Sequence, residues 1–413
     1  MMYVAVMGYG TVGSGVVEVL TKNHDSIVKK SLHDDIAVKY ILDCRDFSAH
    51  LDSKKFIKDF NTILEDPEID VVVETMGGID PAFDFSLACL KKGKSVVTSN
   101  KELVAAKGLE LLNAARENNA NFLFEASVGG GIPIIRPISQ CLAANEIEEI
   151  CGILNGTTNF ILSKMIKDNL SFDQSLKLAQ ENGYAEKDPT DDIDGHDAAR
   201  KICILASLCF GNHVYPEHVY TEGITNITLA DIDYASSFGS VIKLIAVAKK
   251  CSGGKIYTIV SPAIVNNASQ LSGVDDVFNA VLVKGNATGD VVFYGKGAGK
   301  MPTASAVVAD VIDCSNHLIH RKDFGWDASS ENYVTDYLDA VLSLYVRARA
   351  KDPVKALNSL HKTFDCATVL TRKNAPADEI AFVTPAACER DLLEKIRGID
   401  EIEILSTIRV SEC

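Results

Sequence analysis

Residues 3–13, YVAVMGYGTVG, decide the fold class of this chain. Residues 3–7 form an apolar run of strand length, and the G-x-G-x-x-G pattern after it opens a helical segment. Glycines at this spacing let the backbone turn tightly and approach a pyrophosphate, while the helix N-terminus offers free N–H groups to the anion. The stretch predicts a Rossmann domain that binds a dinucleotide; a tight turn without a nucleotide is the alternative. The predicted cofactor contacts are Gly8, Gly10, Thr11, Val12 and Gly13.

Strands and helices alternate through the first third of the chain, which favours a doubly wound parallel sheet. The patterns predict strands at 3–7, 37–42, 71–74, 95–98 and 121–125, and helices at 13–21, 81–92 and 102–117. We therefore expect an α/β fold with a Rossmann domain at residues 1–130. A later helix at 303–314 is expected to pack back on this domain.

The rest of the chain changes character twice. Residues 131–320 combine expected strands at 146–155, 257–265 and 277–284 with expected helices at 157–167, 172–181, 195–210 and 240–250, which indicates a central α+β domain. A polar stretch at 315–336 has the composition of a linker. Residues 337–413 show the order β-α-β-β-α-β, which is typical of a ferredoxin-like domain.

Composition narrows the class of partner. The formal net charge is 41 − 56 = −15, which disfavours binding to nucleic acid or to an anionic membrane. No apolar run reaches the roughly 18 residues of a membrane span, and the N-terminus is an expected strand rather than a signal peptide. Eleven cysteines occur without C-x-x-C spacing. We therefore expect free thiols in a cytoplasmic protein, rather than disulfides or a zinc site.

Two charged residues after the second predicted strand bear on the choice of dinucleotide. Asp43 suits the ribose 2′-hydroxyl of NAD, whereas Arg45 suits the 2′-phosphate of NADP. The alternative is that both are solvated loop charges. We expect NAD or NADP, with a slight preference for NAD. Thr75 and Gly77, which follow the third predicted strand, are further expected cofactor contacts.

Two more segments follow predicted strands of the same sheet, where ligands collect in doubly wound folds. Lys101 precedes a predicted helix, where the helix dipole disfavours a cation, so it either contacts a ligand or faces solvent. Three consecutive glycines at 129–131 leave bare backbone groups, which suit a ligand, a cation or a hinge between domains.

The segment 183–201, GYAEKDPTDDIDGHDAARK, carries the densest charge pattern. Asp197 and Lys201 lie four residues apart, so they meet on one face of a predicted helix, and that face continues with apolar residues. A buried charge is costly unless it is paired, and proteins tend to keep such pairs where chemistry needs them. Upstream, Gly156 and Thr157 open another predicted helix, where Thr157 is either an N-cap or part of a carboxylate site.

Together these segments resemble homoserine dehydrogenase. The match is most specific at 179–201, and it also includes the opening glycine loop, the run 125–133, GKGAG at 295–299 and PTASA at 302–306. It covers most of residues 1–320. The C-terminal module, 337–413, resembles the ACT regulatory domain of many bacterial members. We therefore expect the monofunctional bacterial form, with 131–320 as the substrate-binding, catalytic and dimerisation domain.

The resemblance implies an oxidoreductase that reversibly transfers a hydride between L-homoserine and L-aspartate 4-semialdehyde, in threonine and methionine biosynthesis. It implies Lys201 as proton donor and acceptor, oriented by Asp197, with Lys101 as a further catalytic and cofactor-binding residue close to the reacting group. The implied substrate-binding residues are Glu186, Asp192, Gly156 and Thr157. A Na⁺ or K⁺ ion, which prefers oxygen ligands, is implied at the backbone carbonyls of Glu125, Val128, Gly130 and Ile132. The resemblance also implies a homodimer or homotetramer and an amino-acid effector at the ACT domain.

Two departures from the family pattern leave alternatives open. Lys296 stands where the family usually has proline, and Asp352-Pro353-Val354 lacks the glycine that normally follows this proline in ACT domains. The C-terminal module could therefore serve dimerisation instead of effector binding. The competing functions are a dehydrogenase for another small amino-acid aldehyde and a catalytically silent amino-acid sensor.

Overall fold

The computed structural model describes residues 1–31, 35–318, 322–331 and 333–413. Within these residues the chain forms two compact units. Unit 1 comprises Met1–Glu146, Cys203–Pro216 and Phe293–Ser329, and unit 2 comprises Ile147–Ile202, Glu217–Val292 and Ser330–Cys413. Each unit is therefore assembled from stretches that are distant in the sequence.

Unit 1 is built on a parallel sheet, and its strand order over the described residues is β3-β2-β1-β4-β5-β6. Because β1 pairs in parallel with both β2 and β4, the strand order reverses beside β1. Such a switch point is where doubly wound folds bind ligands, so the predicted Rossmann sheet is confirmed. The strands are β1 (Met2–Met7), β2 (Ile36–Leu42), β3 (Phe56–Ile57), β4 (Ile69–Glu74), β5 (Ser95–Thr98) and β6 (Phe122–Leu123).

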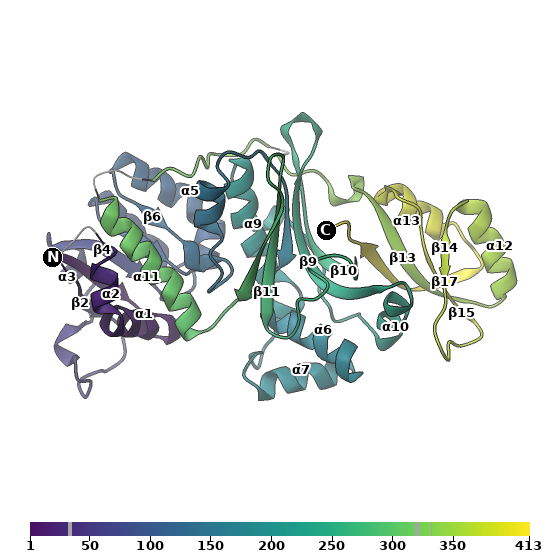
Figure 1. Ribbon diagram of the computed structural model, residues 1–413, viewed down its shortest axis with the longest axis horizontal. Coiled ribbons are helices and arrows are strands. Elements are labelled where there is room, and N and C mark those ends of the chain that lie inside the picture. The colour runs from purple at the N-terminus through teal and green to yellow at the C-terminus, as the bar shows by residue number, and fades with distance from the viewer. Residues whose placement is uncertain (32–34, 319–321, 332) are drawn as a thin grey trace. The chain divides into compact units, whose positions relative to one another are not determined.

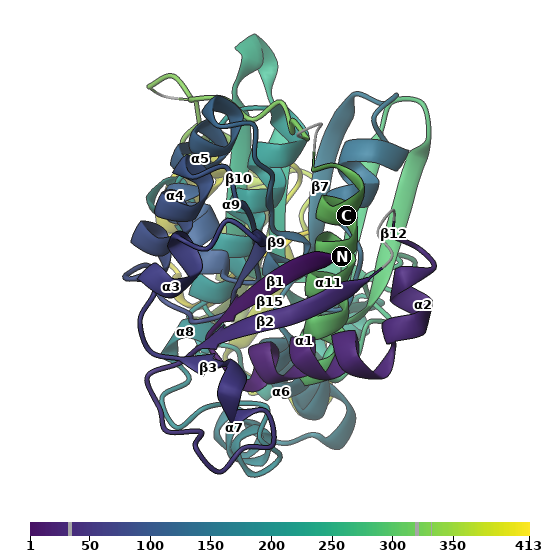
Figure 2. The same ribbon diagram turned by 90° about the vertical axis from the view of Figure 1, so that its left-hand side faces the viewer.

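Helices cover both faces of this sheet. Figure 2 shows α1 and α11 beside β1 and β2, with α4 and α5 on the other side. Val16 of α1 and Val307 of α11 share one buried cluster with the strands. Gly15 permits the close approach, because a Cβ there would lie 2.9 Å from the carbonyl oxygen of Lys300. The helices of unit 1 include α1 (Thr11–Lys22), α2 (His24–Val28), α3 (Asn61–Leu64), α4 (Ala82–Lys91), α5 (Lys101–Glu117) and α11 (Lys300–Asn316).

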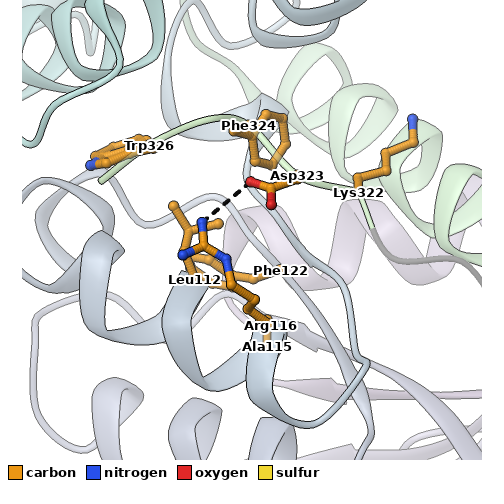
Figure 3. A pocket seen from close by; sticks show the side chains of 8 residues that line it. All are labelled: Leu112, Ala115, Arg116, Phe122, Lys322, Asp323, Phe324 and Trp326. Atoms are coloured by element: carbon orange, nitrogen blue, oxygen red, sulfur yellow. Dashed lines mark hydrogen bonds and ion pairs between the residues drawn. The ribbon is translucent and has the colours of Figure 1, made fainter. Parts of the chain in front are cut away.

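Part of the expected linker at 315–336 belongs to the core of unit 1, so that expectation is wrong there; residues 319–321 and 332 lie outside the described residues. The Trp326 side chain is 1% exposed, and its indole N–H donates to His213 Nδ1 at 3.0 Å. Figure 3 shows this segment against α5, where Arg116 pairs with Asp323 at 3.3 Å. The segment is polar on average, and this average does not reflect its one tryptophan. Burial of that large aromatic side chain is enough to hold the segment in the core.

Unit 2 is built on a second, mixed sheet. For the described part of the chain its strand order is β12-β11-β7-β9-β10-β17-β13-β15-β14. The central neighbours β11, β7, β9 and β10 are antiparallel, whereas β10 and β17 are parallel. The central strands are β7 (Ile147–Ile153), β8 (Tyr220–Thr221), β9 (Ser240–Lys250), β10 (Ile256–Asn266), β11 (Phe278–Gly285) and β12 (Gly289–Lys296). Its helices include α6 (Gly156–Asp168), α7 (Phe172–Glu181), α8 (Thr190–Ile193) and α10 (Leu229–Ser237). Helix α9 (His196–Phe210) begins in unit 2, and its residues from Cys203 onward belong to unit 1.

The prediction of a helix at 240–250 is wrong, because this segment is strand β9. β9 pairs with β10 along its whole length and with β7 on its other edge. Seven of its eleven residues are buried, five of them in succession, so it lacks the alternation of a half-buried strand. Periodicity alone does not separate such a strand from a buried helix.

The C-terminal module has the predicted β-α-β-β-α-β order, with the short strand β16 added. Leu344, Leu360, Phe382 and Leu392 place both helices on one face of its sheet, as Figure 1 shows. Through the β10–β17 pairing this sheet continues the central sheet of unit 2. The elements are β13 (Val341–Ala350), α12 (Pro353–Thr363), β14 (Thr368–Leu370), β15 (Glu379–Val383), β16 (Ala387–Cys388), α13 (Glu389–Arg397) and β17 (Ile402–Val410).

The structure bears on membrane spans and on disulfides, the two features whose absence is expected from composition. Over the described residues, no helix combines the length and apolar character that crossing a membrane requires. None of the eleven cysteines forms a disulfide.

Candidate active site and cofactor-binding loop

The glycine loop after β1 leaves room for a phosphate group. Gly8 has φ +92°, and a Cβ there would lie 2.8 Å from the carbonyl oxygen of Thr75. At Gly13 a Cβ would lie 1.9 Å from the Gly8 oxygen, whereas at Gly10 it would meet nothing within 4 Å. Gly10 is the N-cap of α1 and has no side chain to bond the first-turn N–H groups. These groups and the open space at Gly10 fit a pyrophosphate.

Asp43 and Arg45 bind each other at the end of β2. Asp43 Oδ2 accepts the N–H of Tyr9 at 2.8 Å and Arg45 Nη2 at 2.8 Å. Asp43 Oδ1 accepts the Arg45 backbone N–H at 2.9 Å and Nε at 3.0 Å. The Arg45 hydrogen bond is the largest cause that holds the pKa of Asp43 well below its usual range. These four bonds fill the lone-pair sites of the carboxylate, so it has no vacant site for a ribose hydroxyl.

A buried glutamate that sequence reasoning missed connects the ends of β4 and β5. Glu74 is fully buried and accepts the Thr98 hydroxyl at 2.5 Å and the N–H of Met76 at 2.7 Å. Burial raises the pKa of this carboxyl. Asn100 then donates to the carbonyl of Gly78 at 2.6 Å and caps α5, which begins at Lys101. The expected segments around Thr75, Gly77 and Lys101 are thus joined through hydrogen bonds.

The run 125–133 folds into a buried turn. The Glu125 carboxylate accepts three backbone N–H groups, from Ile134, Ile135 and Arg136, at 2.6, 2.9 and 2.8 Å. The backbone N–H of Glu125 donates to Asp310 Oδ2 at 2.8 Å. Because the carboxylate is turned toward these N–H groups, a cation held here would bind carbonyl oxygens, as the resemblance implies for Glu125, Val128, Gly130 and Ile132.

The predicted ion pair of α9 is present and nearly buried. Lys201 Nζ lies 2.6 Å from Asp197 Oδ2, and the two side chains are 12% and 4% exposed. Lys201 also donates to the carbonyl of Leu154 at 2.8 Å. A lysine ammonium has three N–H donors. Two of them are therefore occupied, and the described residues provide no hydrogen-bond partner for the third.

Asn155 is the centre of this site, and the sequence predictions did not include it. Its Nδ2 donates to Asp192 Oδ1 at 2.6 Å and to Asp197 Oδ2 at 2.8 Å. Its Oδ1 accepts the N–H of Thr158 at 2.8 Å and so caps α6. Its position one residue before Gly156 was the available signal, because asparagine is a preferred N-cap.

The remaining expected substrate residues divide into two groups. Gly156 and Thr157 form the first turn of α6, and the Thr157 hydroxyl donates to the carbonyl of Tyr184 at 2.6 Å, so it does not cap the helix. Glu186 is exposed in the loop before α8, and its carbonyl accepts a bond from Gln180 at 3.1 Å. Over the described residues its carboxylate is not part of the Asn155 cluster.

Carboxylates outnumber cations among the bonded groups of this cluster. Asn155 bonds two carboxylates, those of Asp192 and Asp197, and the Lys201 ammonium pairs with Asp197. Burial raises the pKa of Asp192, and the charge of Asp197 raises it further. A substrate with its own ammonium group would relieve this repulsion, because an opposite charge favours the ionised carboxylates.

The sequence of this chain is similar to those of known proteins over nearly its whole length. The chain matches the homoserine dehydrogenase family at residues 133–312 and the homoserine dehydrogenase NAD binding domain at residues 8–125. The homoserine dehydrogenase of Bacillus subtilis is 35% identical over 426 residues, covering 98% of this chain and 96% of that protein.

Solved structures give the same result. The homoserine dehydrogenase of Thiobacillus denitrificans has a TM-score of 0.90 and 35% identity over 99% of this chain and 98% of that chain. A hyperthermophilic archaeal homoserine dehydrogenase in complex with NADPH has a TM-score of 0.64 and 30% identity over 76% of this chain and 97% of that chain. The chain therefore belongs to the homoserine dehydrogenase family, the NAD(P)-dependent oxidoreductases that reversibly transfer a hydride between L-homoserine and L-aspartate 4-semialdehyde.

Proposed function

We propose that Lys201 is the proton donor and acceptor of the homoserine reaction and that Asp197 orients it. The supporting observation is that two donors of the ammonium are fixed, by Asp197 and by the Leu154 carbonyl. The third donor is left for the oxygen of the substrate. Reduction of the aldehyde develops negative charge on that oxygen, and a positioned cation that can release a proton lowers this barrier. In the oxidation direction neutral Lys201 accepts the hydroxyl proton.

The substrate amino group would be held by carboxylates of the same cluster. Asp192 is the best-placed partner, since its pKa is raised by burial and an incoming ammonium would stabilise its ionised form. Glu186 is exposed and would close over the amino group from the loop before α8. The substrate carboxylate fits the first turn of α6, at Gly156 and Thr157, where backbone N–H groups lie beside the helix dipole.

Unit 1 provides the cofactor residues. NAD(P), when bound, supplies the hydride acceptor of homoserine oxidation. The pyrophosphate would lie on the first turn of α1, at Gly10, Thr11 and Val12. Arg45 would contact the adenosine ribose, where its guanidinium suits a 2′-phosphate, while Asp43 orients it. The filled carboxylate sites of Asp43 therefore favour NADP over the slight preference for NAD drawn from the sequence.

Further assignments rest on the same resemblance. We infer that Lys101, in the first turn of α5, contributes positive charge near the reacting group. We infer a Na⁺ or K⁺ at the carbonyls of Glu125, Val128, Gly130 and Ile132, because the Glu125 carboxylate is bonded to backbone N–H groups and such an ion prefers oxygen ligands.

The larger organisation is also inferred. We propose a cofactor domain at 1–130, a catalytic and dimerisation domain at 131–320, and a regulatory ACT-like domain at 337–413, in a homodimer or homotetramer. The ferredoxin-like topology supports the last domain, and an amino-acid effector is its expected ligand. The free thiols support a cytoplasmic location, because the cytoplasm keeps cysteines reduced. Homoserine oxidation with NAD and with NADP, with and without threonine, tests cofactor choice and effector together.

The role of Lys201 is tested by Lys201→Ala. We expect turnover to fall by at least about 100-fold, the usual contribution of a positioned acid–base group, with cofactor affinity nearly unchanged. Small primary amines added to this variant should restore part of the activity. Lys187→Ala is the matched control, because Lys187 is exposed in the preceding loop. An equal loss of turnover and cofactor affinity, or full activity in the variant, would contradict the proposal.

A further inference from the structure

A thiol–carboxylate cluster lies in unit 2 outside the residues assigned to the reaction. Glu149 and Cys151 stand two residues apart on β7, and Cys413 follows three residues after β17. Both sulfur atoms and one oxygen of Glu149 lie within 4.8 Å of one another. Cys413 Sγ and Glu149 Oε1 are 3.1 Å apart. The three ligand atoms therefore lie close together, although the residues that carry them come from the first and the last stretch of unit 2.

Sheet pairing explains this convergence. β17 joins β10 through Ile264 and Val410, and the N–H of Ser411 continues the pairing by donating to the Ile264 carbonyl at 2.9 Å. The chain then turns, with the Cys413 N–H donating to the Ser411 hydroxyl at 3.1 Å. Cys413 joins the apolar cluster that contains Cys151. Alternate residues of a strand share a face, so Glu149 lies on the same face as Cys151.

We propose that Glu149, Cys151 and Cys413 form a binding site for a thiophilic divalent cation, of which Zn²⁺ is the physiological representative. Two thiolates and a carboxylate are ligands that zinc takes in proteins. Tetrahedral zinc, with bonds of about 2.3 Å to sulfur and about 2.1 Å to oxygen, places its ligand atoms about 3.5–3.8 Å apart. The observed separations, at most 4.8 Å, are closed by a small movement of the half-buried Cys413.

The cluster is accessible from solvent. Glu149 and Cys413 line two surface cavities, of about 370 Å³ and about 300 Å³. A positive charge, that of Lys249, lies beside the cluster, with its Nζ 3.6 Å from Glu149 and 3.8 Å from Glu412. This lysine is 48% exposed, so it can pair with Glu412 while Glu149 turns to the cation. Three protein ligands leave the fourth position of a tetrahedral ion for water.

Occupation of the site would connect two parts of unit 2. Cys151 lies on the strand that leads to Leu154 and Asn155, and Cys413 follows the last strand of the ferredoxin-like module. The cation would hold the module's end against β7. The inference is independent of the proposed roles in homoserine oxidation, because none of its three ligands is assigned to the substrate, the cofactor or Lys201.

Cadmium titration of the reduced, metal-free full chain tests the site. Cd²⁺ bound to thiolates gives an ultraviolet charge-transfer band, and we expect this band to saturate with a component of one ion per chain. Cys151→Ser and Cys413→Ser should each abolish that component, and Glu149→Gln should weaken it. Cys251→Ser is the matched control, because Cys251 lines the larger cavity but is not a member of the cluster. Zn²⁺ should raise the thermal midpoint of the wild type and of the control, and not that of Cys413→Ser.

The outcomes separate clearly. An unchanged band in both serine variants, or equal loss in the Cys251→Ser control, would overturn the proposal. Formation of a Cys151–Cys413 disulfide under air, with no cation bound by the reduced chain, would also overturn it and identify a redox pair instead. Homoserine oxidation by each metal-free variant at the wild-type rate shows that the variant is folded.

Discussion

Asn155 donates to the same oxygen of Asp197 that pairs with the Lys201 ammonium, Oδ2, at 2.8 Å. The two donors fix this carboxylate from different directions. Asn155 is also the N-cap of α6, so one side chain couples the start of a helix to the candidate acid–base pair. This arrangement makes Asn155 a positioning residue for Lys201.

Asn155→Ser should separate these two functions. Serine is also a good N-cap, so the thermal midpoint should stay close to the wild type, whereas Asn155→Ala should lose about 1 kcal/mol of cap stability. Neither shorter side chain can bond both carboxylates. We expect kcat to fall about 10- to 100-fold in both variants, as for a small misplacement of a reacting group. A fall in kcat that tracks the midpoint, with Asn155→Ser fully active, would show that the residue only caps the helix.

Asp192→Asn should weaken homoserine binding. Loss of a charge-assisted hydrogen bond to the substrate ammonium costs about 1.5–3 kcal/mol, so KM for homoserine should rise about 10- to 100-fold, with KM for the cofactor unchanged. Asp191→Asn is the control, because Asp191 is half-exposed and pairs with Arg200 at 2.7 Å. Equal effects of the two substitutions would contradict the assignment.

The pH dependence of homoserine binding follows from the same residue. The ionised form of Asp192 binds the ammonium, and burial raises the pKa of this carboxyl in the folded protein. Homoserine affinity should therefore weaken as pH falls, at a higher pH than an ordinary aspartate would give. The dependence of KM on pH in the wild type measures this, and Asp192→Asn should remove it. A pH-independent KM in the wild type would be inconsistent with the prediction.

Arg45→Ala should change cofactor preference. The Arg45 side chain is 57% exposed and that of Asp43 is 6% exposed. The guanidinium, rather than the carboxylate, is therefore accessible to a bound ribose. Without it, kcat/KM for NADP should fall about 10- to 100-fold, while NAD should gain because the Asp43 carboxylate becomes available to the 2′-hydroxyl. Rates with both cofactors measure the ratio. An unchanged ratio would place the adenosine ribose elsewhere.

Asp310→Asn should alter the pH dependence of stability. Burial raises the pKa of Asp310 to about 8, although Arg136 opposes this shift. A carboxyl whose pKa is higher in the folded state holds its proton longer there, so wild-type stability falls as pH rises from about 4 to about 8. Asparagine cannot ionise, so its thermal midpoint relative to the wild type should rise by several degrees over this range. The opposite trend would show that Asp310 is ionised and stabilised by Arg136.

The sequence determined the parts of this protein whose signals are local. The run 3–13 identified the strand, the glycine turn and the helix, because Gly8 and Gly13 are required by close contacts within one loop and with the neighbouring strand. The spacing of Asp197 and Lys201 gave their ion pair, since residues four apart meet on a helix. The order of elements after residue 337 gave the ferredoxin-like module in the same way.

Only the tertiary structure decided the features that depend on partners far apart in the chain. β9 is a strand because β7 pairs with one of its edges and β10 with the other. Its apolar sequence by itself does not distinguish a buried strand from a buried helix. Asn155 became the centre of the site because β7 ends beside α9, which places Asp192 of α8 and Asp197 of α9 within reach of one amide. Cys413 meets Cys151 for the same reason: hydrogen bonds between strands, which join residues without regard to sequence separation, set the final position of each side chain.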